Sequence, residues 1–160
     1  MDAASYQALL AYNREMKTLD DLYRTAARRC GLGECAFWIL YTLRFEKAAF
    51  TQADICEFLV EPKQTVNSAL KKLVSAGLLT LRTGTDQRSK QILVTEEGDK
   101  FCKVHVDPVL EAEAGSLLAM GEEDRAAILR LTKRYRTLFE ARLCGGENLT
   151  KELPADFCGI

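Results

Sequence analysis

The stretch that decides the fold is KQTVNSALKKLVSAG, residues 63–77. At 100° per residue its apolar side chains gather on one face, which predicts an amphipathic helix with that face packed on a core. Pro62 suits a helix start, and Gly77 is typical of the residue just beyond a helix end. We therefore predict a helix over residues 63–76. Its core face consists of Val66, Ala69, Leu70, Leu73 and Val74.

The opposite face of this helix carries amides, hydroxyls and amines but no carboxylate. Such groups contact base edges and phosphates in the major groove of DNA. An ordinary surface helix would include glutamates that pair with its lysines. We therefore expect this face to bind double-stranded DNA. The candidate contacts are Lys63, Gln64, Thr65, Asn67, Ser68, Lys71 and Lys72.

A shorter helical pattern lies directly upstream and begins at Thr51. The Thr51 side chain is a good N-cap, and Asp54 favours the first turn of a helix. Only a short connection at Glu61 and Pro62 separates this pattern from the helix over residues 63–76. Two helices joined in this way predict a helix-turn-helix.

Downstream of Gly77 the pattern changes to two short strand-like runs, residues 78–82 and 91–95. They flank a polar, glycine-containing stretch, which predicts a β-hairpin with a long loop. Next to a helix-turn-helix, such a hairpin forms a wing.

The wing offers its own candidate contacts. An arginine at its tip gains from the negative potential of a narrow minor groove, and Arg88 is the candidate. Arg82 and Lys90 are expected nearer the DNA backbone. Asp86 is placed to orient the Arg88 guanidinium or to cap the turn. The alternative is that Asp86 and Arg88 form only a surface ion pair.

Charge is unevenly distributed along the chain. From Pro62 to Lys90 there are six basic residues and a single acid, Asp86, so this segment carries +5 while the whole chain carries −1. A basic block in an acidic body is typical of a localised phosphate-binding surface.

Helical periodicity also marks residues 6–29 and 35–45, and a further helical region opens at Thr95 with Pro108 as a kink or break. A last long helix begins at Gly121. The predicted order is four helices, a hairpin and two helices. The fold class is therefore mainly α with a small β-hairpin wing.

Length and composition fit a folded protein. The chain has 160 residues, of which 48% are hydrophobic and 28% charged. This length suits one domain. No stretch approaches the roughly 20 apolar residues of a membrane span, and the first ten residues lack the pattern of a secretory signal. We therefore expect a cytoplasmic protein with no membrane partner.

The six cysteines are not arranged as a metal site. Cys30 and Cys35 form one C-x4-C pair, His105 is the only histidine, and structural zinc needs four ligands at paired spacing. We expect no metal. Cys30 and Cys35 are possible redox residues, since Arg28 and Arg29 could lower a thiol pKa.

At this point the chain resembles the multiple-antibiotic-resistance regulator (MarR) family. The resemblance extends over about residues 6–143. It rests on five elements in order: residues 50–55, residues 63–73, Gly77-Leu78-Leu79, residues 86–90 with their Asp-x-Arg pattern, and residues 93–98, which end in Thr95-x-x-Gly98. One departure is Ile55-Cys56, where the family often has Leu-Ala; cysteine is a small hydrophobe at a position expected to be buried.

The resemblance implies a winged helix-turn-helix with N- and C-terminal dimerisation helices. Residues 6–29 and 104–143 would form the dimerisation region, residues 35–100 the DNA-binding lobe, and residues 145–160 a C-terminal tail. It also implies a homodimer on a pseudo-palindromic DNA operator, and a small aromatic effector bound between the dimer helices and the lobe. Apolar stripes on the flanking helices independently favour a partner.

The sequence thus predicts a transcriptional regulator, a repressor that a small ligand releases from DNA. Two alternatives stay open: a cysteine-based redox sensor, and a winged helix that serves protein contacts without DNA. Catalysis finds no support, because no phosphate-binding loop, nucleophile elbow or ligand set is present. No cofactor is expected.

Overall fold

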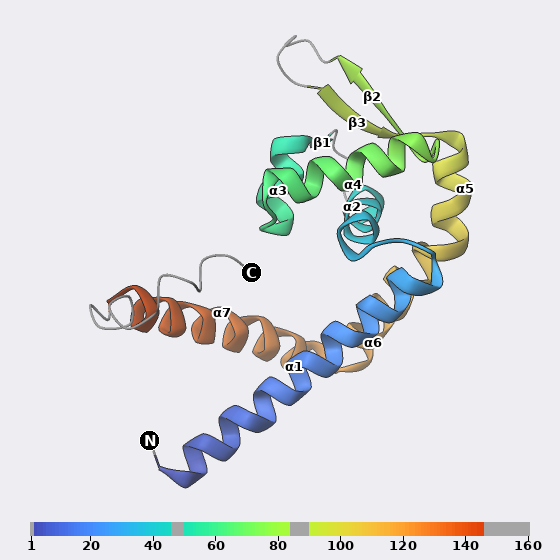
Figure 1. Cartoon of the computed structure of the whole chain (residues 1–160). Coiled ribbons are helices and arrows are strands. Elements are labelled where there is room, and N and C mark those ends of the chain that lie inside the picture. Colours follow the sequence, from blue (N-terminus) through green and yellow to red (C-terminus); the bar gives the residue numbers. More distant parts are fainter. Residues whose placement is uncertain (1, 46–49, 84–89, 146–160) are drawn as a thin grey trace. The chain divides into compact units, whose positions relative to one another are not determined.

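The computed structural model describes residues 2–45, 50–83 and 90–145. The chain forms two compact units, residues 1–112 and 113–160. The elements follow in the order α1 (Ala3–Arg29), α2 (Glu34–Phe45), β1 (Phe50–Thr51), α3 (Gln52–Leu59), α4 (Lys63–Ser75), β2 (Leu79–Thr83), β3 (Lys90–Val94), α5 (Glu96–His105), α6 (Asp107–Ala119) and α7 (Gly121–Gly145) (Figure 1).

Helix α2 is the centre of the core. It is apolar on nearly all sides, and Phe37, Ile39 and Leu40 are fully buried. Helices α3 and α4 pack against α2 and contribute the buried side chains of Ile55 and Leu73. The C-terminal part of α1 also packs on this core. The mainly helical fold with a hairpin wing is therefore confirmed.

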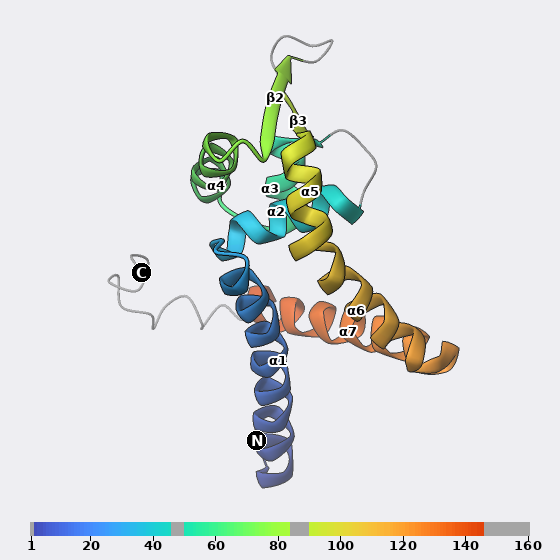
Figure 2. The same cartoon turned by 90° about the vertical axis from the view of Figure 1, so that its right-hand side faces the viewer.

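The sheet has three antiparallel strands in the order β1-β3-β2. Strands β2 and β3 form the predicted hairpin, with Leu81 opposite Ile92. The two views show the hairpin extending beyond the helices (Figures 1 and 2). The third strand, β1, was not predicted. It pairs Phe50 with Ile92 and Thr51 with Gln91, so it ties the start of α3 to the wing.

A tight joint connects the hairpin to α5. Thr95 is the N-cap of α5, and its hydroxyl accepts from the Gly98 amide at 2.9 Å and donates to the Gly77 carbonyl at 2.6 Å. A Cβ atom added at Gly98 would lie 2.0 Å from the Leu78 carbonyl oxygen. The Thr-x-x-Gly pattern therefore marks a place where two backbones touch and only glycine fits.

Pro108 gives a break rather than a kink, since α5 ends at His105 and α6 begins at Asp107. Three helices therefore follow the hairpin where the sequence predicted two. Arg44 of α2 bridges this break: its guanidinium donates to Asp99 of α5 at 2.6 Å and, through Nε, to Asp107 of α6 at 2.7 Å. The hydrogen bonds that Arg44 donates to Asp107 raise the pKa of the Arg44 guanidinium, which stays charged.

The long terminal helices leave much apolar surface exposed. Along α1 only Ala27 is buried. Within residues 121–144, no side chain of α7 is buried. None of the helices in the described ranges is long and apolar enough to cross a bilayer.

Part of the sequence analysis falls outside the described residues. This holds for Asp86 and Arg88 in the wing and for the tail after Gly145. The predicted division into a dimerisation region and a DNA-binding lobe stays a prediction.

Candidate nucleic-acid interface

Helix α4 packs as its pattern predicts, with one exception. Val66, Ala69, Leu70 and Leu73 are buried. Val74, expected in the core, is 36% exposed. It lies at the edge of the apolar face, where it lines a groove instead of filling the core.

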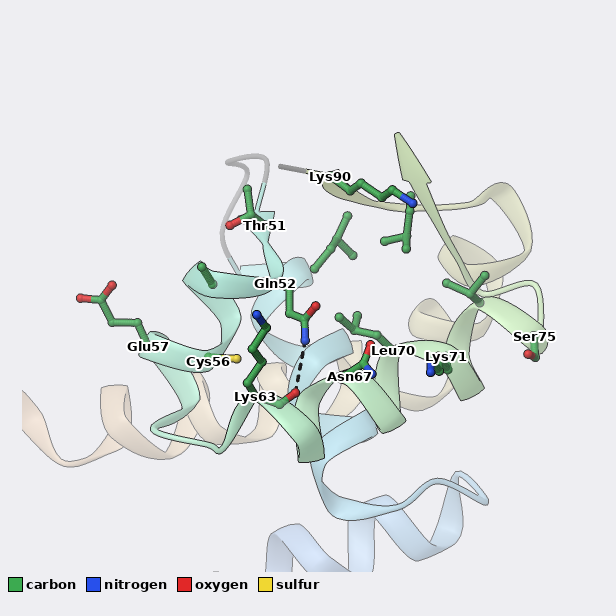
Figure 3. A pocket seen from close by; sticks show the side chains of 14 residues that line it. Thr51, Gln52, Cys56, Glu57, Lys63, Asn67, Leu70, Lys71, Ser75 and Lys90 are labelled. Atoms are coloured by element: carbon green, nitrogen blue, oxygen red, sulfur yellow. Dashed lines mark hydrogen bonds between the residues drawn. The ribbon is translucent and has the colours of Figure 1, made fainter. Parts of the chain in front are cut away.

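This groove has a volume of about 1120 Å³ and lies between α3, α4 and the wing strands (Figure 3). Four predicted contacts line it: Lys63, Asn67 and Lys71 from α4, and Lys90 from β3. Three amines and an amide from two separate elements thus face one concave surface. Because an anion placed there meets charge from more than one side, the groove suits a phosphate backbone.

The other predicted contacts on described residues do not line the groove. They are nevertheless exposed on α4 and β2, on surfaces open to a long ligand such as a duplex: Gln64, Thr65, Ser68, Lys72 and Arg82.

Two groove residues, Thr51 and Gln52, were missing from the predicted contacts. The Thr51 hydroxyl accepts from the Asp54 amide at 3.3 Å, and the Asp54 carboxylate accepts from the Thr51 amide at 2.7 Å, so the two form a capping box. Gln52 Nε2 donates to the Lys63 carbonyl oxygen at 3.2 Å. The Thr51 cap was predicted, but no local pattern connects residues 52 and 63.

The turn between α3 and α4 contains a strained residue. Val60 has φ of 54° and lies in the left-handed region, which is unfavourable for a β-branched side chain. The turn is held by the Glu61 amide, which donates to the Cys56 carbonyl at 3.1 Å. The Val60 side chain is 88% exposed, so no packing compensates for its conformation.

Within the described residues, acidic groups do not neutralise the groove. Glu57 lies at its rim, and its side chain points away from the lysines (Figure 3). Asp54 is engaged in the capping box, where hydrogen bonds from the Thr51 backbone and hydroxyl lower its pKa. Within the described residues, no three His, Cys, Asp or Glu side chains gather as a metal site.

The cysteines differ from the predicted redox picture. Burial raises the thiol pKa of Cys30 and of Cys35, whereas the redox alternative requires a lowered pKa. Arg28 is turned to Thr25, to whose hydroxyl it donates at 2.9 Å. Cys56 is half-buried rather than fully buried, and it lines the groove.

A second, smaller cavity of about 530 Å³ lies between α1 and the α5–α6 break. Its walls are largely apolar, with Leu22 on one side and Val109 on the other, and Arg29 and His105 add polar groups. This size suits a small organic molecule.

A helix-turn-helix beside a hairpin, with lysines converging on one groove, defines a winged-helix protein. Residues 31–89 match the model of the MarR family. Over this segment the chain is similar to the MarR family, whose members are transcriptional regulators and not enzymes.

The likeness to known proteins extends beyond this segment. The chain is 29% identical over 105 residues, 66% of its own length and 76% of the relative's, to the uncharacterized HTH-type transcriptional regulator YwoH of Bacillus subtilis (strain 168). Among solved structures, the MarR family regulator NMB1585 of Neisseria meningitidis has a TM-score of 0.66 at 23% identity, over 86% of this chain and 95% of that one. The S. aureus MepR-DNA complex has a TM-score of 0.63 at 22% identity, over 81% and 97%. These structures share the fold.

Proposed function

We propose that this protein is a MarR-family transcriptional regulator that binds a pseudo-palindromic operator in double-stranded DNA as a homodimer in the cytoplasm, represses transcription, and is released by a small ligand. The observation that carries the proposal is the groove in which Lys63, Asn67, Lys71 and Lys90 converge beside the carboxylate-free face of α4. The MepR structure, solved with DNA, supports the same use of this fold.

In this proposal α4 enters the major groove. Gln64 and Ser68, exposed on the outer face of α4, contact base edges. The lysines that line the groove of the protein contact phosphates. Arg88, predicted from the sequence alone, enters the minor groove.

DNA binding is tested by selecting duplexes from a random pool and titrating the selected duplex and a scrambled one at several salt concentrations. We expect preferential binding with a steep salt dependence, because each phosphate contact releases counterions. Arg88→Ala should weaken that binding strongly. Failure to enrich any sequence would favour the alternative of a winged helix used for protein contacts.

The homodimer is supported by apolar side chains that the single chain leaves exposed. On α1 they include Tyr6, Leu19 and Leu22, and on α7 Leu131 and Phe139. Helix α7 has 25 residues and no buried side chain within residues 121–144, so it gains little from its own chain, because most helical stability comes from packing an apolar face. A second copy would supply that packing.

Sedimentation tests this part. Leu131, 51% exposed, lies on the apolar side of α7, whereas Thr137 lies on its polar side. Leu131→Glu should shift the protein toward monomer, and the matched variant Thr137→Glu should sediment like the wild type. Equal association of both variants would contradict the proposed interface.

The cavity between α1 and the α5–α6 break supports a small-ligand effector, because it is large enough for an aromatic ring and offers Arg29 to an acidic group. Adding substituted phenols or benzoates to the complex should release the protein from the selected duplex. Ala112→Phe, which narrows this cavity, should raise the ligand concentration needed. If the variant leaves the duplex at the same ligand concentration as the wild type, the effector binds elsewhere.

A further inference from the structure

The wing, α3 and α4 meet at two consecutive residues, Thr51 and Gln52. Thr51 pairs with Gln91 of β3, and the same residue is the N-cap of α3. Gln52, the first residue of α3, reaches across to α4, where its Nε2 donates to the Lys63 carbonyl at 3.2 Å (Figure 3). The wing strand and the first turn of α4 are therefore joined through one short segment.

Helix α4 lacks a side-chain cap of its own. Its N-cap residue is Pro62, which makes no side-chain hydrogen bond, and the turn before it contains the strained Val60. The start of α4 is thus weakly fixed by local interactions. Lys63, the first residue of the helix, is also a groove residue, so a shift of this turn moves a DNA contact.

We propose that Gln52 is a positioning residue for DNA recognition: its amide holds the first turn of α4 in register with the wing. This inference rests on the proposed DNA binding. A duplex requires the side chains on α4 and those on the wing to reach their targets together. The hydrogen bond from Gln52 fixes that spacing. The positive charge of the lysines, in contrast, attracts the phosphates of any duplex and does not depend on the exact position of the helix.

The test uses Gln52→Met, which keeps the length of the side chain and removes its donor. Gln64→Met makes the same change on the outer face of α4, where the proposal places a direct base contact. Gln7→Met, on exposed α1, is the control for the substitution itself. All are titrated with the duplex selected by the wild-type protein, with a scrambled duplex, and with single-base variants of the selected one.

We expect Gln52→Met to bind the selected duplex about five- to tenfold more weakly, as fits the loss of one hydrogen bond. Its affinity for the scrambled duplex and its salt dependence should not change, and its preference should weaken across the whole half-site. Gln64→Met should lose preference at one base pair, and Gln7→Met should match the wild type.

Three results overturn the inference. In the first, Gln52→Met binds the selected duplex like the wild type. In the second, it loses preference at one base pair only. In the third, it loses affinity for both duplexes, with a shallower salt dependence. The last two would make Gln52 a direct contact with a base or a phosphate. If the wild-type protein selects no sequence, the proposed function itself fails, and that result precedes any variant.

Discussion

Replacing Gly98 by alanine should strongly destabilise the protein, although alanine is the better helix former. The added Cβ would lie 2.0 Å from the Leu78 carbonyl oxygen and 2.9 Å from its carbon. Backbone atoms, not a flexible side chain, form this contact. To avoid the clash, the Leu78 carbonyl has to move by about 1 Å, since a Cβ atom essentially never lies within 3.0 Å of such an atom.

The magnitude follows from what that carbonyl holds. It accepts from the Thr95 amide at 3.1 Å and lies 3.2 Å from the Thr95 hydroxyl. Losing these two interactions costs about 1 kcal/mol each, and overpacking costs about 1–3 kcal/mol. The better helix propensity of alanine returns about 1 kcal/mol. The net loss in the free energy of unfolding is therefore about 2–4 kcal/mol.

Urea unfolding measures this loss, with the fluorescence of Trp38 as the probe. Trp38 is the only tryptophan in the sequence, and its ring lies against Tyr23 and Tyr41. At a slope of about 2 kcal/mol per molar, the midpoint should fall by about 1–2 M. The protein concentration is held constant because association shifts the midpoint.

The matched control is Gly33→Ala. A Cβ at Gly33 meets nothing within 4 Å, and the residue lacks a left-handed φ. This variant should change the free energy of unfolding by less than about 1 kcal/mol, the scale of a helix-cap exchange. If Gly98→Ala unfolds at the wild-type midpoint with the same slope, the close approach of the two backbones is refuted.

Three further predictions concern the groove, the turn and the cap. Lys71→Ala should weaken binding to the selected duplex and reduce the salt slope by about 1 for each copy of the lysine that contacts phosphate; an unchanged slope would remove Lys71 from the interface. Val60→Asn should raise the free energy of unfolding by about 1 kcal/mol, because asparagine tolerates the left-handed region and no contact is lost; an unchanged or lower urea midpoint would argue against strain in the turn. Asp54 has a lowered pKa in the folded protein, so its contribution to stability is present above its ordinary value of 3.8 and is lost as the pH falls through the folded pKa. Asp54→Asn should therefore flatten the fall of the urea midpoint below about pH 4, and an equally steep fall would show that other carboxylates cause it.

The helices could be predicted from the sequence because their signals are local. The spacing from Val66 to Leu73 repeats at 3.6 residues, and Thr51 with Asp54 marks a helix start within four positions. Strand β1 escaped prediction because it has two residues, too few for an alternating pattern. Its existence depends on pairing with Ile92 and Gln91, which lie 42 and 40 positions away from their partners along the chain.

The candidate site, too, could be predicted only where its signals are local. Lys63 and Asn67 could be named from the residue types on one helical face. The groove itself could not, because its walls come from α3, α4 and the wing together. The prediction that Val74 packs in the core was wrong for this reason. Val74 lies at the border of the apolar face, and only the tertiary arrangement decides whether a neighbour covers it. The contact of Gln52 with Lys63 likewise requires knowledge of the angle between two helices.

The ion pairs of Arg44 restrict bending between α5 and α6. Its single guanidinium holds carboxylates on both sides of the α5–α6 break, Asp99 before it and Asp107 after it. A hinge at Val106 cannot bend freely while both are bound, so rotation of α6 either breaks charged hydrogen bonds or drags α2 along. Hydrogen bonds with Lys103 and Arg44 lower the pKa of Asp99, so the tether persists at neutral pH. The two ion pairs therefore couple the start of α6 to the core that carries α4, and the pair with Asp99 is lost when acid protonates that carboxylate.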